Sequence, residues 1–219
     1  MSIQSNCDFS LIHYGDIVTE IRDRFRVVDF RGGVAEHVDG ARRAVILRHD
    51  IDFSIEIALE MARLEDRVGV RSTYFVRLDA RNYNALFLQS YESLRRILDL
   101  GHDIGLHYSV GTSHLTGESP FVVIDRQLRI LRELLSFDVR VGAAHEPDRL
   151  KIETEQVLAN TGLEIEAYQP RFVRDMKYIS ESGGRWRERC ACQWLDRDVD
   201  LCILTHPFWW YEQTPLERY

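Results

Sequence analysis

Five consecutive residues, Arg48-His49-Asp50-Ile51-Asp52, combine a guanidinium, an imidazole and two carboxylates. They follow the apolar run Ala44-Val45-Ile46-Leu47, which is typical of a short buried strand. Because side chains alternate along a strand, we expect Asp50 and Asp52 on one side and His49 and Ile51 on the other. Two carboxylates on one face repel each other unless a cation lies between them, and zinc and the hard divalent ions both accept carboxylate oxygens. The motif therefore predicts a metal site.

A second interpretation gives Asp52 a structural role, because aspartate is a preferred N-cap and a helix is expected directly after it. The two roles are compatible. The metal site is favoured by three histidines, His107, His145 and His206, each of which follows an expected strand. The carboxyl ends of parallel strands collect the catalytic groups of α/β folds. Asp or His at four separate strand ends therefore favours an enzyme with a metal site.

The elements that must position these residues alternate along the chain. Apolar spacing predicts helices over 14–25, 54–68, 91–100, 121–135 and 152–160, with Gly69 ending the second of them. Runs of β-formers predict strands over 26–30, 44–48, 72–78, 103–107, 139–144, 163–168 and 199–205, and residues 169–189 are expected to be polar and irregular. This order implies an α/β fold with a parallel sheet, either closed into a barrel or doubly wound, and one domain over residues 1–219.

Composition narrows the possible classes. The net charge of -7 argues against a nucleic-acid partner. We expect no membrane span and a cytoplasmic location, because no long apolar run and no signal peptide are present. The cysteines, Cys7, Cys190, Cys192 and Cys202, have no CxxC spacing. Cys190 and Cys192 could bind a metal, although ordinary free thiols are the simpler interpretation, and the oligomeric state is left open.

Four stretches together resemble a known family: Leu47–Asp52, Ser72–Phe75, Gly101–His107 and Leu204–Pro207. They are similar, in order, to the polysaccharide deacetylase superfamily, also called NodB-homology or carbohydrate esterase family four. The most specific is Gly-His-Asp-Ile-Gly-Leu-His. The resemblance implies a distorted (β/α) barrel of about seven parallel strands. It also implies a hydrolase that removes N- or O-acetyl groups from sugars with a divalent metal, usually zinc.

The same resemblance implies a role for each matching residue. Asp50 matches the catalytic base and His206 the acid that protonates the leaving group. Asp52 takes the place of the family's metal aspartate, since Ile51 stands where that residue usually lies, and His107 matches the first metal histidine. Gly111 stands where a second histidine is expected, so His145 is the candidate for third ligand or for orienting Asp50. These departures resemble a branch with an H-D-[IV]-D signature, associated with surface polysaccharide (O-antigen) biosynthesis, whose substrate would be a polysaccharide, lipid-linked or nucleotide-sugar precursor.

Other residues could bind the substrate: Arg48, Tyr168, Arg185, Trp186 and Trp209. Arg185 could bind an anion and Trp186 could stack on a sugar, or the loop that holds them could be plain surface. Trp209 could line the pocket or simply pack. Arg48 could instead pair with a carboxylate near the site. His49 and His102 are expected to be structural, and His13, His37 and His114 to be surface or loop residues. The alternatives to a deacetylase are a catalytically inactive protein that binds a sugar or a protein partner, and a metal phosphoesterase.

Overall fold

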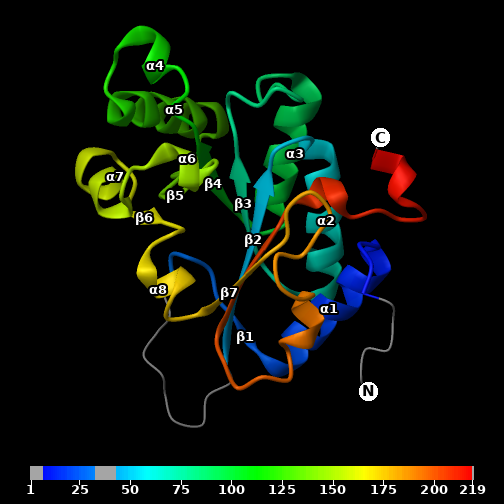
Figure 1. Ribbon diagram of the computed structural model, residues 1–219. Coiled ribbons are helices and arrows are strands. Elements are labelled where there is room, and N and C mark those ends of the chain that lie inside the picture. Colours follow the sequence, from blue (N-terminus) through cyan, green and yellow to red (C-terminus); the bar gives the residue numbers. More distant parts are fainter. Residues whose placement is uncertain (1–6, 33–42, 219) are drawn as a thin grey trace.

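Strands and helices alternate around one curled parallel sheet (Figure 1). The computed structural model describes residues 7–32 and 43–218. The strands are β1 (Arg26–Val27), β2 (Ala44–Ile51), β3 (Thr73–Val76), β4 (Asp103–Tyr108), β5 (Val141–Ala144), β6 (Ile165–Glu166), β7 (Lys177–Ser180) and β8 (Leu201–Thr205). The helices are α1 (Leu11–Arg24), α2 (Ile55–Val68), α3 (Leu88–Asp99), α4 (Ser113–Thr116), α5 (Pro120–Leu135), α6 (Pro147–Leu150), α7 (Thr154–Asn160) and α8 (Pro170–Val173). Three 3-10 helices are η1 (Ala191–Gln193), η2 (Pro207–Trp209) and η3 (Pro215–Arg218).

The sheet has β2 near its centre. Its order is β6-β5-β4-β3-β2-β8-β7, and β1 pairs with the beginning of β2 through Arg26 and Ala44. Every strand pair is parallel, so the carboxyl ends of all the strands meet at one edge. Seven strands curl into a half-barrel with β6 and β7 at its two ends, surrounded by helices. The predicted fold class, an α/β distorted barrel, is confirmed.

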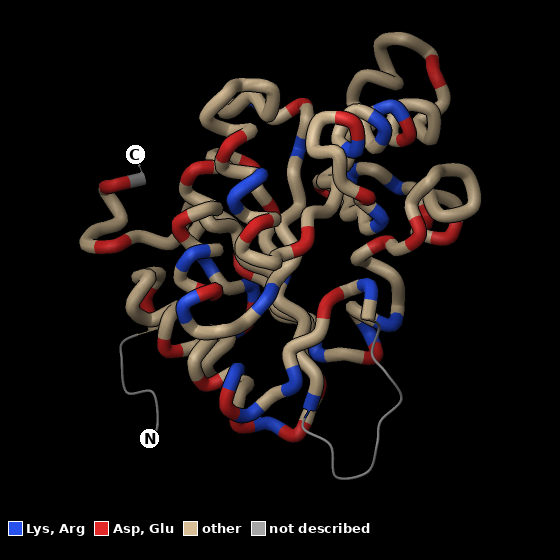
Figure 2. Tube along the Cα trace, turned by 180° about the vertical axis from the view of Figure 1, so that it is seen from behind, with Lys and Arg blue, Asp and Glu red and all other residues tan. Residues whose placement is uncertain are grey.

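Alternation along β2 divides its side chains between two cores. Val45 and Leu47 face a core that they share with α1, whereas Ile46 faces the inside of the half-barrel with Phe75 of β3. Helices α1, α2, α3 and α5 follow one another around the outer face (Figure 1). No described helix is long and apolar enough to cross a bilayer. Acidic and basic residues are interspersed along the trace (Figure 2).

The N-cap of α2 is not Asp52. Ser54 is the N-cap, since its hydroxyl accepts a hydrogen bond from the backbone N–H of Ile57. The prediction that Asp52 could cap this helix is wrong, which leaves its carboxylate for the site. At the other end, Gly69 stops the helix as predicted, with a φ of 87° that glycine adopts readily.

The prediction that residues 169–189 are irregular is wrong. It contains α8 and the four-residue strand β7, which pairs with β8. The sequence Lys-Tyr-Ile-Ser gives a weak signal because β7 ends the sheet and its first two residues are only half-buried. The strands expected over 26–30 and 163–168 have only two residues each in the structure. Phe30 lies beyond the end of β1 and packs against Phe172 inside the barrel.

Candidate active site

A cavity of about 480 Å³ lies at the carboxyl edge of the sheet. Its lining includes all five residues that the sequence indicates as catalytic or metal-binding: Asp50, Asp52, His107, His145 and His206. They come from the carboxyl ends of β2, β4, β5 and β8, which are far apart in the sequence but lie within five consecutive strands of the sheet, with β3 between β2 and β4. The parallel register of these strands is what brings them together.

Asp50 is held by Arg48, two residues earlier on the same side of β2. Arg48 Nε and Nη2 donate to Asp50 Oδ1 and Oδ2 at 2.8 and 2.9 Å, a bidentate pair with both residues buried. Burial raises the pKa of Asp50, but the charge and hydrogen bonds of Arg48, together with the charges of His107 and His206, outweigh it and the pKa is lowered. Asp50 is therefore a carboxylate at neutral pH.

Arg48 does not reach the cavity. It is 0% exposed, and its guanidinium lies between the rings of Tyr168 and Phe75, 4.4 and 5.0 Å from their centroids. The prediction that Arg48 binds substrate is wrong, because both sides of the guanidinium are covered. Its position supports the alternative that it pairs with a nearby carboxylate, and it fixes the orientation of Asp50.

Asp52 and His107 form the pair that is best suited to a metal. His107 Nδ1 lies 3.0 Å from the carbonyl oxygen of Ala143, so Nδ1 carries the proton and Nε2 presents its lone pair to the cavity. Asp52 Oδ1 lies 3.4 Å from that Nε2 and is buried without a hydrogen bond from any described residue. Burial raises the pKa of Asp52, but His107, His206 and His145 outweigh it and keep the carboxyl ionised. An unsatisfied carboxylate oxygen beside an imidazole lone pair fits a divalent metal such as zinc.

His145 lies against this pair. Its Nδ1 is 3.3 Å from His107 Nε2 and 3.5 Å from Asp52 Oδ1, so one ligand atom from each of the three residues could reach a single ion. On its other side, Arg77 Nη1 lies 2.7 Å from His145 Nε2. A guanidinium only donates, so Nε2 accepts and Nδ1 carries the proton. His145 becomes a neutral ligand through Nδ1 only as the other tautomer, with its proton on Nε2, which requires Arg77 to turn away from Nε2. Arg48, rather than His145, orients Asp50.

His206 is paired with a residue that the sequence did not indicate, Glu181. Its Nδ1 lies 3.0 Å from Glu181 Oε1, and its Nε2 faces Asp52 Oδ2 at 3.6 Å. Burial lowers the pKa of His206, but the hydrogen bond and charge of Glu181 outweigh it, so the pKa is raised. Glu181 follows β7 directly, the same arrangement as at the other strand ends. The sequence does not indicate Glu181, because residues 169–189 are predicted to be irregular and the strand before Glu181 is not recognised.

The residues expected to contact substrate separate into two groups. Tyr168 and Trp209 line the cavity. Arg185 and Trp186 do not: Trp186 stacks on Phe9, 5.9 Å between ring centroids, and packs in the core beside α1. Arg187, two residues after Arg185, lines the cavity instead. An isolated antiparallel bridge between Glu181 and Trp186 closes this loop.

The other histidines are mostly as expected. His49 and His102 are buried and hydrogen-bonded, and His114 is exposed on α4. The prediction that His13 is a surface or loop residue is wrong, because it lies in α1 with 1% of its surface exposed. His37 lies outside the described residues.

Comparisons with known proteins identify solved structures with a similar fold. No protein-family model and no curated protein matches the chain. Among solved structures, a mutant of the peptidoglycan deacetylase PdaC from Bacillus subtilis is similar at 15% identity, covering 83% of this chain and 82% of that one with a TM-score of 0.51. IcaB from Ammonifex degensii matches at 15% identity over 71% of this chain and 74% of that one, with a TM-score of 0.50. The chitin deacetylase of Colletotrichum lindemuthianum matches at 18% identity over 74% and 73%, with a TM-score of 0.48. The structures of PdaC and IcaB thus share the fold of this chain.

Proposed function

We propose that the protein is a metal-dependent hydrolase that removes an N- or O-acetyl group from a sugar. The observation that supports this most directly is that one cavity holds two ionisable side chains, each paired with a group of opposite charge. The pKa of Asp50 is lowered beside Arg48, and the pKa of His206 is raised beside Glu181. Asp52 lines the same cavity, and its Oδ1 is buried without a hydrogen bond from any described residue. A base, an acid and a metal-binding pair are the groups that amide hydrolysis requires.

Each residue has a distinct task in this proposal. A divalent metal held by Asp52 and His107, with His145 as third ligand in the tautomer whose proton lies on Nε2, would polarise the acyl carbonyl and acidify a water molecule. Asp50 accepts the proton of the attacking water; Arg48 occupies only part of its lone-pair capacity, so the carboxylate can still bind a proton. His206 donates its proton to the departing nitrogen as the carbon–nitrogen bond breaks. The products are acetate and a free amine; for an ester, the leaving group is an alcohol.

The cavity favours an uncharged sugar end. Asp50 is paired with Arg48 and Glu181 with His206, and Asp52 would face the metal. The other charged residues of the lining are Glu146, Asp148 and Arg187, so this part of the wall offers only one cation to the phosphates of a nucleotide sugar. Trp209 and Phe53, whose ring centroids lie 5.4 Å apart, form an aromatic wall on which a sugar ring could stack. A neutral acetylated sugar of a surface polysaccharide or its lipid-linked precursor is the substrate class that we propose.

The test combines metal content with acetate release. Zinc and other divalent ions are measured in the purified wild type, in His107→Ala and in His114→Ala, the matched control on the exposed helix α4. The same samples are assayed for acetate release from acetylated oligosaccharides and nucleotide sugars. We expect His107→Ala to lose one equivalent of metal relative to the wild type and at least ~100-fold in activity, and His114→Ala to lose neither.

Two outcomes would contradict the proposal. Metal content that is equal in all three proteins, even after reconstitution with zinc, would exclude His107 as a ligand. Metal binding at His107 without acetate release from any acetylated sugar would favour a catalytically inactive sugar-binding protein of this fold. Release of phosphate from a phosphate ester instead would favour a phosphoesterase.

A further inference from the structure

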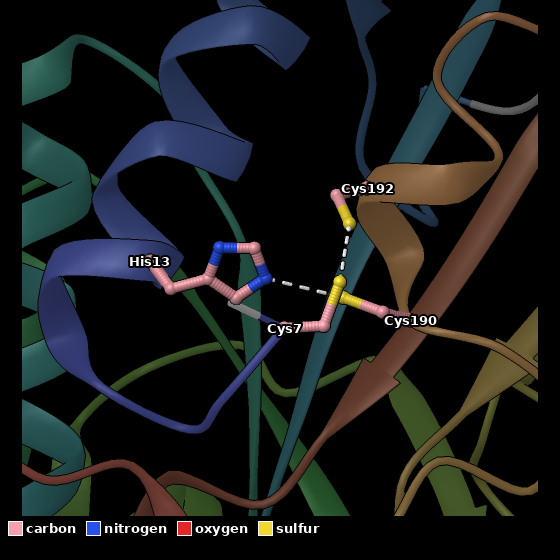
Figure 3. Close-up of side chains that lie close together, drawn as sticks. All are labelled: Cys7, His13, Cys190 and Cys192. Carbon is pink, nitrogen blue, oxygen red and sulfur yellow. Dashed lines mark hydrogen bonds between the residues drawn. The ribbon is translucent and has the colours of Figure 1, made fainter. Parts of the chain in front are cut away.

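A second group of ligand-forming side chains lies away from the cavity, beside the N-terminus of α1. Cys7, His13, Cys190 and Cys192 come from three segments and point toward one another (Figure 3). Cys7 Sγ is 3.4 Å from Cys192 Sγ, and His13 Nε2 is 3.2 Å from Cys190 Sγ. One ligand atom from each of the four residues lies within 4.8 Å of all the others.

The backbone around this group is fixed by independent contacts. Ser10 caps α1 by accepting from the N–H of His13, which places the imidazole in the first turn of the helix. The segment after Cys7 pairs with the C-terminal segment: the N–H of Tyr211 donates to the carbonyl of Phe9 at 2.9 Å. Cys190 and Cys192 lie at the start of η1, and Cys190 is 3% exposed. The four side chains are therefore brought together by structure that does not depend on them.

We propose that Cys7, His13, Cys190 and Cys192 bind a structural zinc ion. With Zn–S bonds of about 2.3 Å, tetrahedral coordination places neighbouring sulfur atoms about 3.8 Å apart. The Cys7–Cys192 sulfur separation of 3.4 Å is close to that value, and all four ligand atoms lie within 4.8 Å of one another. Three thiols lose their protons to the solvent as zinc binds, giving three Zn–S bonds and one Zn–N bond to a neutral imidazole. Three thiolates and an imidazole are a donor set that selects zinc, and they leave no open position for a substrate.

The ion would connect the N-terminal region to one wall of the cavity. Cys190 follows the loop that contributes Glu181 and Arg187 to the cavity, and Trp186 of that loop packs on Phe9, two residues after Cys7. Through its bonds to Cys7 and Cys190, the zinc ion would link the segment that contains Phe9 to the loop that contains Trp186. The site would therefore stabilise the loop that holds Glu181, without taking part in the chemistry.

The experiment uses the His107→Ala protein, in which the metal pair of the cavity is disabled, so that only the cysteine site is counted. The protein is purified with a reductant, loaded with zinc and desalted. We expect about one equivalent of zinc in His107→Ala, none in His107→Ala/Cys192→Ser, and one in the matched control His107→Ala/Cys202→Ala. Cys202 is a buried cysteine of β8 outside the group. Cobalt in place of zinc should give a near-ultraviolet thiolate charge-transfer band that only Cys192→Ser abolishes.

X-ray absorption of the zinc-loaded His107→Ala protein keeps the proposal testable if the serine variant fails to fold. Sulfur scatterers at about 2.3 Å would support it. Zinc with only nitrogen and oxygen neighbours would overturn it, as would reduced protein that binds no zinc. A disulfide between Cys7 and Cys192 in protein that never takes up zinc would overturn it too, and would identify the contact as a redox pair. None of these results depends on deacetylase activity, so this proposal and the proposed function can fail separately.

Discussion

Two buried glutamates should differ in how much stability is lost when their charge is removed. Glu65 of α2 is 0% exposed and accepts hydrogen bonds from the hydroxyls of Tyr14, Ser72 and Tyr74 at 2.5, 2.7 and 2.6 Å. His49 Nε2 lies 2.9 Å from the same carboxylate. Burial raises the pKa of Glu65, but the histidines and the hydroxyl donors outweigh it and lower the pKa from 4.5 to about 2. The ionised form is thus the stable form in the folded protein.

The lowered pKa sets the size and the pH range of the effect. At about 1.4 kcal/mol for each pKa unit, a fall from 4.5 to about 2 contributes about 3 kcal/mol to the free energy of unfolding at pH 7. Because the folded pKa lies below the unfolded one, this contribution is complete above pH 4.5 and is lost as pH falls toward 2. Glu65→Gln removes it, so the deficit of the variant should shrink from about 3 kcal/mol at pH 7 to about 1.5 at pH 3.

Glu166, at the end of β6, is the matched control. It is also 0% exposed and accepts from the backbone N–H groups of Tyr168 and Ala144, but burial outweighs these bonds and raises its pKa. A raised pKa stabilises the fold at low pH, and that stabilisation is lost as pH rises. Glu166→Gln should therefore cost only about 1 kcal/mol at pH 7, the contribution of an imperfectly replaced hydrogen bond.

Urea unfolding of the three proteins between pH 7 and pH 3 measures both effects. Other carboxylates that titrate in this range are common to all three and cancel in the differences. A Glu65→Gln deficit that stays constant from pH 7 to pH 3 would refute the reasoning. Equal deficits for the two variants at pH 7 would refute it as well, because burial alone would then determine the cost.

Two further predictions concern the charge pairs of the cavity. Glu181→Gln removes the charge that raises the His206 pKa, so the alkaline limb of the pH profile of kcat/KM should move to lower pH. Activity on that limb should fall roughly ten- to hundred-fold, since a hydrogen bond to a charged group contributes about 1.5–3 kcal/mol; an unmoved limb would exclude Glu181 as the positioning residue. Arg48→Met leaves Asp50 buried without a cation and should cost about 3–5 kcal/mol in urea unfolding. Arg48→Met/Asp50→Asn should recover most of that loss, and a double variant no more stable than the single one would contradict the pairing.

The sequence alone predicted what depends on local pattern. A short apolar run followed by Asp or His marks the end of β2, β4, β5 and β8. Because the strands are parallel, these ends lie at the same edge of the sheet. Five side chains that lie as far as 156 residues apart could therefore be assigned to one edge before any contact was known. This works for the central strands, whose short apolar runs are bounded by polar residues and alternate with helical segments.

What escaped prediction depends on packing between distant segments. β7 was missed because an edge strand with half-buried polar residues lacks the apolar signal, and Glu181 was missed with it. The group of Cys7, His13, Cys190 and Cys192 joins residues up to 185 positions apart without a strand register to relate them. The substrate role of Arg48 was wrong for a different reason. Sequence spacing places Arg48 on the correct side of β2. Spacing alone cannot distinguish a side chain that reaches the cavity from one that Tyr168 covers.

The alternation of β2 gives its charged motif two separate tasks. On the inner side, Arg48 fixes Asp50 at the cavity. On the outer side, His49 Nδ1 lies 2.7 Å from Thr205 Oγ1, and its Nε2 contacts Glu65 of α2. His49 and Thr205 are also paired residues in the β2–β8 register, so side chains and backbone fix the same alignment. Thr205 precedes His206, which means that the outer network sets the position of the proposed acid relative to the proposed base. Loss of the Glu65 charge should therefore disturb the cavity as well as the stability, although Glu65 contacts none of the residues that would perform the chemistry.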